Sequence, residues 1–209
     1  PPEELIPQFD YVKDISEQFG FVNIGVANYE ADDVIGTLAK IYSKDNEVHI
    51  VTGDRDILQC INEQVEVWLI RKGFNIYHHY TLNRFNEEYA LHPLQLIDIK
   101  AFMGDSADGY PGVKGIGEKT AIKLIQSYGS VENVLDHIES LTPGQQKKIA
   151  TDKENLILSK QLAEIYTDVP IDTTALYEEM EYTHSLNHIL SICNEHELYV
   201  SGKYLASKF

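Results

Sequence analysis

The feature of this sequence that most constrains its fold is the glycine-rich stretch from Gly104 to Ala121, GDSADGYPGVKGIGEKTA. Its first half contains two carboxylates, Asp105 and Asp108, and its second half contains glycines and lysines. Glycine allows a positive φ and lets another backbone approach closely, so we expect a tight turn followed by a helix that begins near Glu118. The sequence therefore predicts two carboxylates directly beside a glycine turn.

Two lysines of the predicted helix suit a phosphate group. Lys119 and Lys123 are one helical turn apart and therefore lie on one side, beside an N-terminus with free N–H groups and a favourable dipole. An ordinary loop and helix start would also explain a lone GxG pattern. The fusion of carboxylates and glycine turn in one stretch favours a functional site that could hold a metal on one side and a phosphate on the other.

The composition indicates a globular chain. Its 209 residues, 43% of them hydrophobic, suit one large domain or two small ones with a real core. No apolar run approaches the ~18 residues of a membrane span, and the N-terminus lacks a signal pattern, so we expect a soluble chain with no membrane partner. Cys60 and Cys193 have no CxxC or histidine-spaced partner. Buried free thiols and a cytoplasmic location are therefore expected.

The formal net charge of −16 is unusual for a protein that binds nucleic acid, because affinity for phosphates normally comes from Lys and Arg. Seven carboxylates fall in three short clusters, and two divalent ions would cancel four of these charges. An acidic, solvated surface is the alternative explanation of the charge excess. The seven residues are Glu30, Asp32, Asp33, Asp54, Asp56, Asp105 and Asp108.

Helices and strands are expected to alternate in the first part of the chain. We predict an amphipathic helix from Phe9 to Phe19 that ends at Gly20, a short strand at Val22–Val26, and a second helix capped by Asn28.

The second helix begins with three acidic residues, Glu30, Asp32 and Asp33. Each one alone could merely complement the helix dipole, but three in four positions exceed what capping requires. Glu30 and Asp33 share a face through their i, i+3 spacing, so this pair could converge on one ion.

The run Val48–Thr52 is typical of a parallel strand that is buried on both faces, and it ends at Gly53-Asp54-Arg55-Asp56. Ligands of open α/β sheets bind at such carboxyl ends. Asp54 and Asp56 could therefore face one metal, although an Asp in such a loop often only caps a helix.

A short helix at Ile57–Ile61 and a hairpin complete the predicted sheet region. The hairpin joins Val65–Ile70 to Ile76–Tyr80 around Lys72-Gly73 and gives the sheet an antiparallel edge. His78 and His79 are interpreted as exposed strand residues and not as metal ligands.

Further helices are expected to start at Thr81 and at Pro93, the second of which ends at Gly104. After Gly115 the sequence predicts only helices: Ala121–Tyr128, one capped by Ser130, one opened by the capping box Thr142–Gln145, and Lys153–Tyr166. We therefore predict an α/β fold with a parallel-rich central sheet and flanking helices in residues 1–109, followed by a helical region in residues 110–209.

Four motifs in this order resemble those of the bacterial 5′ nucleases, which include the N-terminal 5′–3′ exonuclease domain of DNA polymerase I, its stand-alone relatives and the wider flap-endonuclease family. The motifs are Tyr29–Asp33, Thr52–Asp56, Gly104–Asp108 and Pro111–Ala121. Tyr166–Pro170 also resembles the family's later helix-to-strand junction. The resemblance implies a PIN-like nuclease fold with a helix–hairpin–helix element in the second region.

The resemblance also implies a reaction. Members hydrolyse phosphodiester bonds at 5′ ends or flaps of DNA, in replication and repair, with two Mg²⁺ ions that Mn²⁺ can replace. By resemblance, the first metal region comprises Glu30, Asp32, Asp33 and Asp54, and the second comprises Asp56, Asp105 and Asp108. Asp33, Asp54 and Asp108 are the residues we assign to catalysis.

The glycine turn resembles the element with which relatives bind the duplex backbone without regard to sequence, and with which some hold a monovalent cation such as K⁺ through backbone carbonyls. The implied partners are DNA with 5′ ends or flaps and a DNA polymerase, and we expect a monomer. The residues assigned to DNA binding are Gly112, Lys114, Gly115, Gly117, Lys119, Thr120 and Lys123.

Two departures from the family pattern qualify the expected activity. Gly109 stands where relatives usually have Asn. The family's initial Asp-bearing strand and basic helical arch have no counterpart from Pro1 onward, so we expect the sequence to start within a longer protein and to be less active alone. Two other functions therefore stay open: a DNA-binding module without catalysis, and a different Mg²⁺-dependent phosphohydrolase such as a phosphatase with paired aspartates. The helix–hairpin–helix resemblance argues against the second.

Overall fold

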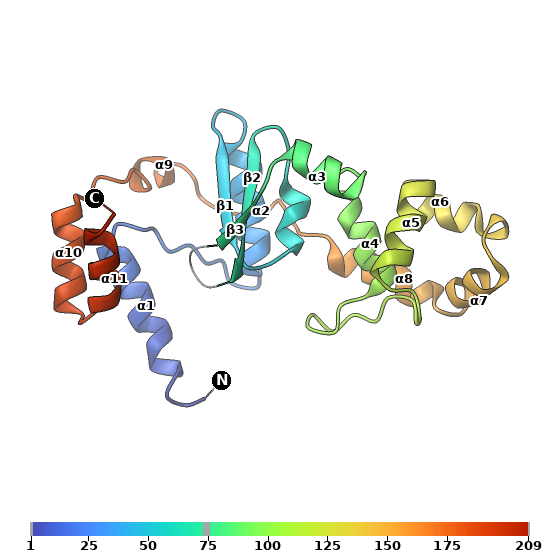
Figure 1. The fold of residues 1–209 in the computed structure, drawn as a ribbon, viewed down its shortest axis with the longest axis horizontal. Coiled ribbons are helices and arrows are strands. Elements are labelled where there is room, and N and C mark those ends of the chain that lie inside the picture. The colour runs from blue at the N-terminus through green and yellow to red at the C-terminus, as the bar shows by residue number, and fades with distance from the viewer. Residues whose placement is uncertain (1, 73–75, 209) are drawn as a thin grey trace. The chain divides into compact units, whose positions relative to one another are not determined.

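The computed structural model of the chain describes residues 2–72 and 76–208. The chain divides into two compact units (Figure 1). One consists of Tyr29–Val169, and the other combines Pro1–Asn28 with Pro170–Phe209. All of the predicted metal and DNA-binding residues belong to the unit Tyr29–Val169.

A three-stranded mixed sheet lies in the unit Tyr29–Val169 (Figure 1). Its order is β1 (Val48–Thr52), β2 (Val65–Lys72), β3 (Ile76–Tyr80). β1 runs parallel to β2, and β2 runs antiparallel to β3, as the sequence predicts. The turn expected around Lys72-Gly73 includes residues 73–75, which lie outside the described residues.

Helix α2 (Ala31–Tyr42) packs against β1 and against the short 3-10 helix η1 (Asp56–Cys60), η1 also contacts β2, and α3 (Leu82–Tyr89) follows β3. Ile57, Val65 and Val67 are completely buried in this core. The expectation that β1 is buried on both faces is wrong, because Ile50 is buried whereas Val51 is 61% exposed. Successive side chains of a strand point to opposite faces, and the described elements cover one face of β1.

The rest of this unit is helical. It contains α4 (Gln95–Met103), α5 (Glu118–Tyr128), α6 (Val131–Asp136), η2 (Ile138–Ser140), α7 (Pro143–Thr151) and α8 (Lys153–Ala163). Helix α4 packs against both α5 and α8. The predicted caps are confirmed: the hydroxyls of Thr81, Ser130 and Thr142 each accept a hydrogen bond from the backbone N–H three residues later.

Two helix ends differ from the prediction. The N-cap of α2 is Glu30 and not Asn28, since Asn28 adopts a positive φ of 69° and the helix begins only after that bend. Helix α8 ends at Ala163 and does not reach Tyr166. The buried amide of Gln59 donates to the Ala163 carbonyl (3.1 Å) and accepts from Ile165 N–H (3.1 Å), so it replaces the hydrogen bonds of a further helical turn.

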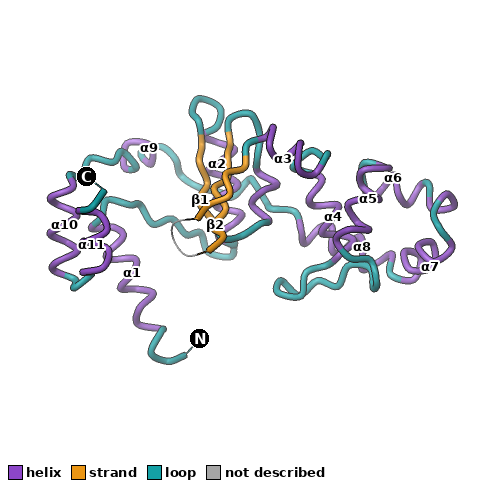
Figure 2. The backbone as a smooth tube through the Cα atoms, viewed as in Figure 1, coloured by secondary structure: helices purple, strands orange, loops and turns teal. Residues whose placement is uncertain are grey.

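The second unit contains α1 (Ile6–Gln18), α9 (Leu176–Glu179), α10 (Leu186–Glu195) and α11 (Tyr199–Ala206). Its buried centre includes Ile192 and Cys193. The strand predicted at Val22–Val26 is wrong, and this segment is drawn as a loop in Figure 2. A strand needs a neighbour for its hydrogen bonds, and the described strands pair only with one another. Within residues 2–72 and 76–208, every helix is too short or too polar for a transmembrane span.

The loop between α4 and α5 is closed by backbone contacts. Asp105 and Tyr110 exchange two N–H···O hydrogen bonds of 2.9 and 3.0 Å. Gly104 and Gly112, both with positive φ, bring their backbones together at the base of this loop. A Cβ on Gly112 would contact the Gly104 nitrogen and lie 2.7 Å from the Phe102 carbonyl oxygen. Only glycine fits this position.

We predict that Gly112→Ala destabilises the protein by at least about 1–3 kcal/mol, because alanine is strained at positive φ and its methyl group overlaps the backbone of α4. Gly144→Ala is the matched control, since Gly144 lies in α7 with open space around it. Urea unfolding of both variants provides the measurement. Equal midpoints for Gly112→Ala and the parent would contradict the packing described.

Candidate metal centre and nucleic-acid interface

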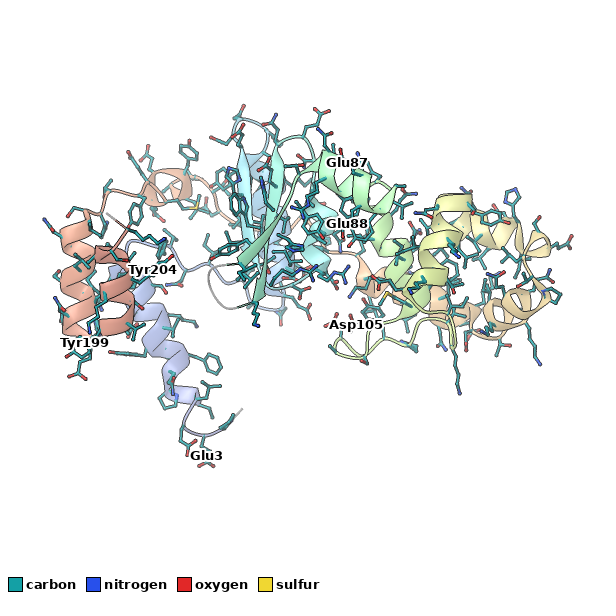
Figure 3. All side chains as sticks on the ribbon, viewed as in Figure 1. Glu3, Glu87, Glu88, Asp105, Tyr199 and Tyr204 are labelled. Carbon is teal, nitrogen blue, oxygen red and sulfur yellow. The ribbon has the colours of Figure 1, made fainter. Side chains whose placement is uncertain are left out.

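Three carboxylates from two segments meet at one place. Asp56 begins η1 just after β1, and Asp105 and Asp108 lie in the loop after α4, where Figure 3 labels Asp105. One ligand oxygen from each of the three lies within 4.8 Å of the others. Among the described residues, no other group of three or more potential metal ligands lies this close together. The structure thus brings together the residues assigned to the second metal region.

Sequence reasoning missed Lys100, which links two of these carboxylates. Its Nζ lies 2.6 Å from Asp56 Oδ1 and 2.5 Å from Asp105 Oδ2. The hydrogen bond from Lys100 lowers the pKa of Asp105, whereas burial raises the pKa of Asp56 and Lys100 opposes that rise. One feature of the sequence could have indicated this role of Lys100: it lies in the last turn of the helix that leads into Asp105.

The donor set fits a hard divalent cation. Carboxylate oxygens are the ligands that Mg²⁺ and Mn²⁺ prefer, and all three residues provide them. One oxygen of Asp56 and one of Asp105 are bonded to Lys100, and the second oxygen of Asp105 accepts a hydrogen bond from Ala107 N–H (2.8 Å). A cation at this site would therefore share its carboxylates with the Lys100 ammonium group.

Asp32 and Asp54 extend the acidic region toward α2. Burial raises the pKa of Asp32 to about 6, and the charges of Asp54 and Asp56 add to the effect. Asp54 Oδ1 accepts a hydrogen bond from Asp56 N–H (2.9 Å), so Asp54 also shapes the turn after β1. Asp32 therefore interacts electrostatically with residues of both predicted metal regions, so the carboxylates of the two regions influence one another.

Asp33 has a structural role that the sequence did not reveal. Its Oδ2 accepts from Glu30 N–H (3.2 Å) at the start of α2, and its Oδ1 accepts from Tyr166 N–H (2.9 Å) in the segment after α8. The hydrogen bond between these two residues involves the backbone N–H of Glu30 and the side chain of Asp33. The predicted arrangement, in which both carboxylates converge on one ion, is a different contact. The metal and catalytic assignments of Asp33 stay predictions.

The glycine turn before α5 is fixed by residues from α7 and α8. Gly112 N–H donates to Ser159 Oγ (2.9 Å), Lys114 N–H donates to Asp152 Oδ2 (2.9 Å), and Lys148 Nζ donates to the Gly115 carbonyl (2.9 Å). Sequence reasoning found none of these three partners, which lie 33 or more positions away along the chain.

Several groups of the turn remain available to a ligand. Within the described part of the chain, the N–H groups of Gly115 and Gly117 have no hydrogen-bond partner. The side chains of Lys119 and Lys123 are exposed on α5, while Thr120 is partly buried. Exposed lysines beside free N–H groups at a helix start are suited to bind a phosphate. The N–H groups of Gly112 and Lys114, by contrast, are already used within the protein.

Comparison with known protein families gives two matches that together span residues 1–185. The model of the N-terminal resolvase-like domain of 5′-3′ exonucleases matches residues 1–90, and the model of their C-terminal SAM fold matches residues 91–185. The chain belongs to the 5′-3′ exonuclease family. The two family models meet between residues 90 and 91. The domain boundary that the sequence predicts between residues 109 and 110 lies inside the second family model and stays a prediction.

Curated members of the family are clearly similar in sequence. A 5′-3′ exonuclease of Bacillus subtilis (strain 168) is 51% identical over 174 residues, which are 83% of this chain and 59% of the relative. A DNA polymerase I of Lactococcus lactis subsp. lactis (strain IL1403) is 42% identical over 175 residues, 82% of this chain and 20% of the relative. The chain thus spans about three fifths of the exonuclease and one fifth of the polymerase.

Solved structures show the same fold. T5 5′-exonuclease with bound divalent zinc ions superimposes with a TM-score of 0.64 at 23% identity, over 93% of this chain and 72% of that one. The catalytic core of Rad2 in complex with a DNA substrate gives a TM-score of 0.60 at 18% identity, over 93% and 66%. The predicted fold class, an α/β nuclease-like region with a helical second region, is confirmed.

We predict that Asp33→Ala lowers the free energy of unfolding by about 1–3 kcal/mol, because two backbone N–H groups lose their acceptor. Asp168→Ala, which removes an exposed partner of Lys40, should change it by less than about 1 kcal/mol. Urea unfolding without divalent ions tests the pair. If Asp33 served only as a metal ligand, its removal would relieve repulsion in the metal-free protein and leave stability unchanged or higher.

Proposed function

We propose that this chain is the nuclease part of a structure-specific 5′-3′ exonuclease and flap endonuclease that hydrolyses phosphodiester bonds of DNA in replication and repair. One observation carries the proposal: Asp56, Asp105 and Asp108 converge at the loop that leads directly into the glycine turn. Metal ligands and a phosphate-binding turn on one short segment suit hydrolysis of a DNA backbone. The B. subtilis relative is named a 5′-3′ exonuclease, which supports this assignment.

The carboxylates would hold two Mg²⁺ ions, which Mn²⁺ can replace. Asp56, Asp105 and Asp108 form one region, and Glu30, Asp32, Asp33 and Asp54 form the other. When bound, such a pair of ions supplies an activated water and stabilises the leaving oxygen. Lys100 holds Asp56 and Asp105 close together and favours the ionised form of Asp105. The metals bound to T5 5′-exonuclease support divalent-ion use.

The glycine turn would position the DNA. The N–H groups of Gly115 and Gly117 and the ammonium groups of Lys119 and Lys123 contact backbone phosphates, which places the duplex without regard to sequence. DNA with 5′ ends or flaps is the proposed substrate, and the DNA in the Rad2 complex supports it. A K⁺ ion at the turn is part of the proposal, although one carbonyl there, that of Gly115, already accepts from Lys148.

The relatives support one class of partner for this chain. In the Lactococcus DNA polymerase I the matching region is one fifth of a longer chain, which supports a functional link to a DNA polymerase. We propose that this chain acts as a monomer in the cytoplasm.

Asp108→Asn tests the metal site. An amide is a poorer ligand than a carboxylate for a hard cation, so calorimetry with Mn²⁺ should show weaker binding. Cutting of a 5′-flap duplex in Mg²⁺ should fall at least about 100-fold, while binding of the same DNA in Ca²⁺ stays close to that of the parent.

Asp45→Asn is the control, because Asp45 is exposed in the loop before β1 and Asp56 follows the other end of that strand. Its cutting rate and Mn²⁺ affinity should match the parent. Unchanged Mn²⁺ binding and cutting in Asp108→Asn would remove Asp108 from the site. Binding without any cutting, even by the chain extended upstream with its natural sequence, would favour a DNA-binding module.

Lys119→Ala tests the DNA interface. Loss of one phosphate contact should weaken binding of unrelated duplexes by a similar factor and reduce the salt slope by about one unit. Fluorescence anisotropy at several salt concentrations measures both quantities. Lys44→Ala, an exposed lysine just after α2, serves as the control and should leave the slope unchanged. A changed sequence preference with an unchanged slope would contradict the assignment.

A further inference from the structure

Two exposed tyrosine rings stack on each other beside the carboxylates. The ring centroids of Tyr29 and Tyr166 are 5.8 Å apart, and the ring planes differ by 17°. Tyr29 is 36% exposed and Tyr166 is 49% exposed. The stack covers one face of each ring, and the exposed fractions show that both tyrosine residues still contact solvent. A flat aromatic surface of this kind can bind another planar group by stacking.

The pair is held in place by Asp33. Tyr166 N–H donates to Asp33 Oδ1, and the same carboxylate accepts from the N–H of Glu30, the residue after Tyr29. One side chain therefore ties the backbone of Tyr166, and that of Glu30 next to Tyr29, to the start of α2. Asp32, the next residue before Asp33, interacts with Asp54 and Asp56. The aromatic surface is thus built into the margin of the carboxylate region.

Cations close to this region along the chain are already paired within the protein. Lys40 bonds to Asp168 (2.7 Å), Arg55 to Tyr89 Oη (2.8 Å), and Lys100 to Asp56 and Asp105. A strand that passes these carboxylates therefore meets few free positive charges. Stacking of a base requires no charge on the protein and tolerates every base, because each base has a π face.

We propose that Tyr29 and Tyr166 form a stacking surface for a nucleobase of single-stranded DNA, which positions the strand next to the carboxylates. This inference rests on the proposed nuclease function and adds a site for the unpaired part of the substrate. The site selects an unstacked base and not a sequence. Duplex DNA, whose bases are already stacked on each other, would contact the glycine turn and not the tyrosines.

Tyr166→Ala tests the stacking surface with a fluorescent 5′-flap DNA in Ca²⁺. Affinity should fall about 5- to 150-fold, with an unchanged salt slope because no counterion release is lost. Tyr166→Phe keeps the ring and should match the parent. Tyr199→Ala, an equally exposed tyrosine of the other compact unit, should have no effect. Binding of a blunt duplex should be the same for all four proteins.

A series of flaps with one abasic position each separates stacking from a disturbed loop. One flap of the series lacks the base that stacks on the tyrosines. This flap should bind the parent more weakly than the intact flap does, whereas Tyr166→Ala should bind both flaps with the same affinity. Tyr166→Trp should in addition show fluorescence quenching when the flap binds. A loss in Tyr166→Ala that persists unchanged with every abasic flap would overturn the stacking role.

The same experiment distinguishes this inference from the proposed function. If the parent cuts the flap in Mg²⁺ and Tyr166→Ala binds it equally well in Ca²⁺, the stacking surface alone is wrong. If the parent neither binds nor cuts DNA, the proposed function fails and the stacking surface fails with it.

Discussion

The Lys100 ammonium group, held between Asp56 and Asp105, is the interaction on which the carboxylate site depends. Carboxylates that meet within 4.8 Å repel one another, and partial burial weakens the screening of that repulsion by water. Lys100 offsets this repulsion from within the protein. Because it belongs to α4, the packing of α4 on α5 and α8 sets the position of the charge that holds the site together. The helical region therefore contributes to the geometry of the carboxylates and also contains the glycine turn.

The loop from Gly104 to Gly112 couples the two halves of the site. It contains Asp105 and Asp108, and its base is closed by direct contact between glycine backbones, a contact without any flexible side chain. From Gly112 the chain enters the turn that Ser159, Asp152 and Lys148 fix in place. The backbone consequently determines the spacing between the carboxylates and the free N–H groups of the turn. The proposed nuclease reaction would need such a constraint, since the bond to be cut must lie at a fixed distance from the phosphates that anchor the DNA.

Local signals in the sequence predicted the elements well, and long-range contacts account for what they missed. The caps at Thr81, Ser130 and Thr142 depend on residues three positions away, so they could be identified directly. The grouping of Asp56 with Asp105 and Asp108 came from the family resemblance. The end of α8 depends on Gln59, 104 positions earlier, and the role of Asp33 depends on Tyr166, 133 positions later. No periodicity or spacing in the sequence encodes such partners.

An acidic chain that binds DNA must obtain its affinity from contacts other than general attraction. The net charge of −16 repels a polyanion at long range, and Lys40 and Lys100 are paired with acidic side chains. Backbone N–H groups and aromatic rings act only at contact distance, where shape would decide which DNA fits, and the exposed lysines of α5 add positive charge beside those N–H groups. In the proposed function, binding through such contacts would favour a substrate that offers a duplex to the glycine turn and an unpaired base to the tyrosines at the same time. A duplex that reaches only the glycine turn would therefore bind more weakly than a junction that also offers a base to the tyrosines.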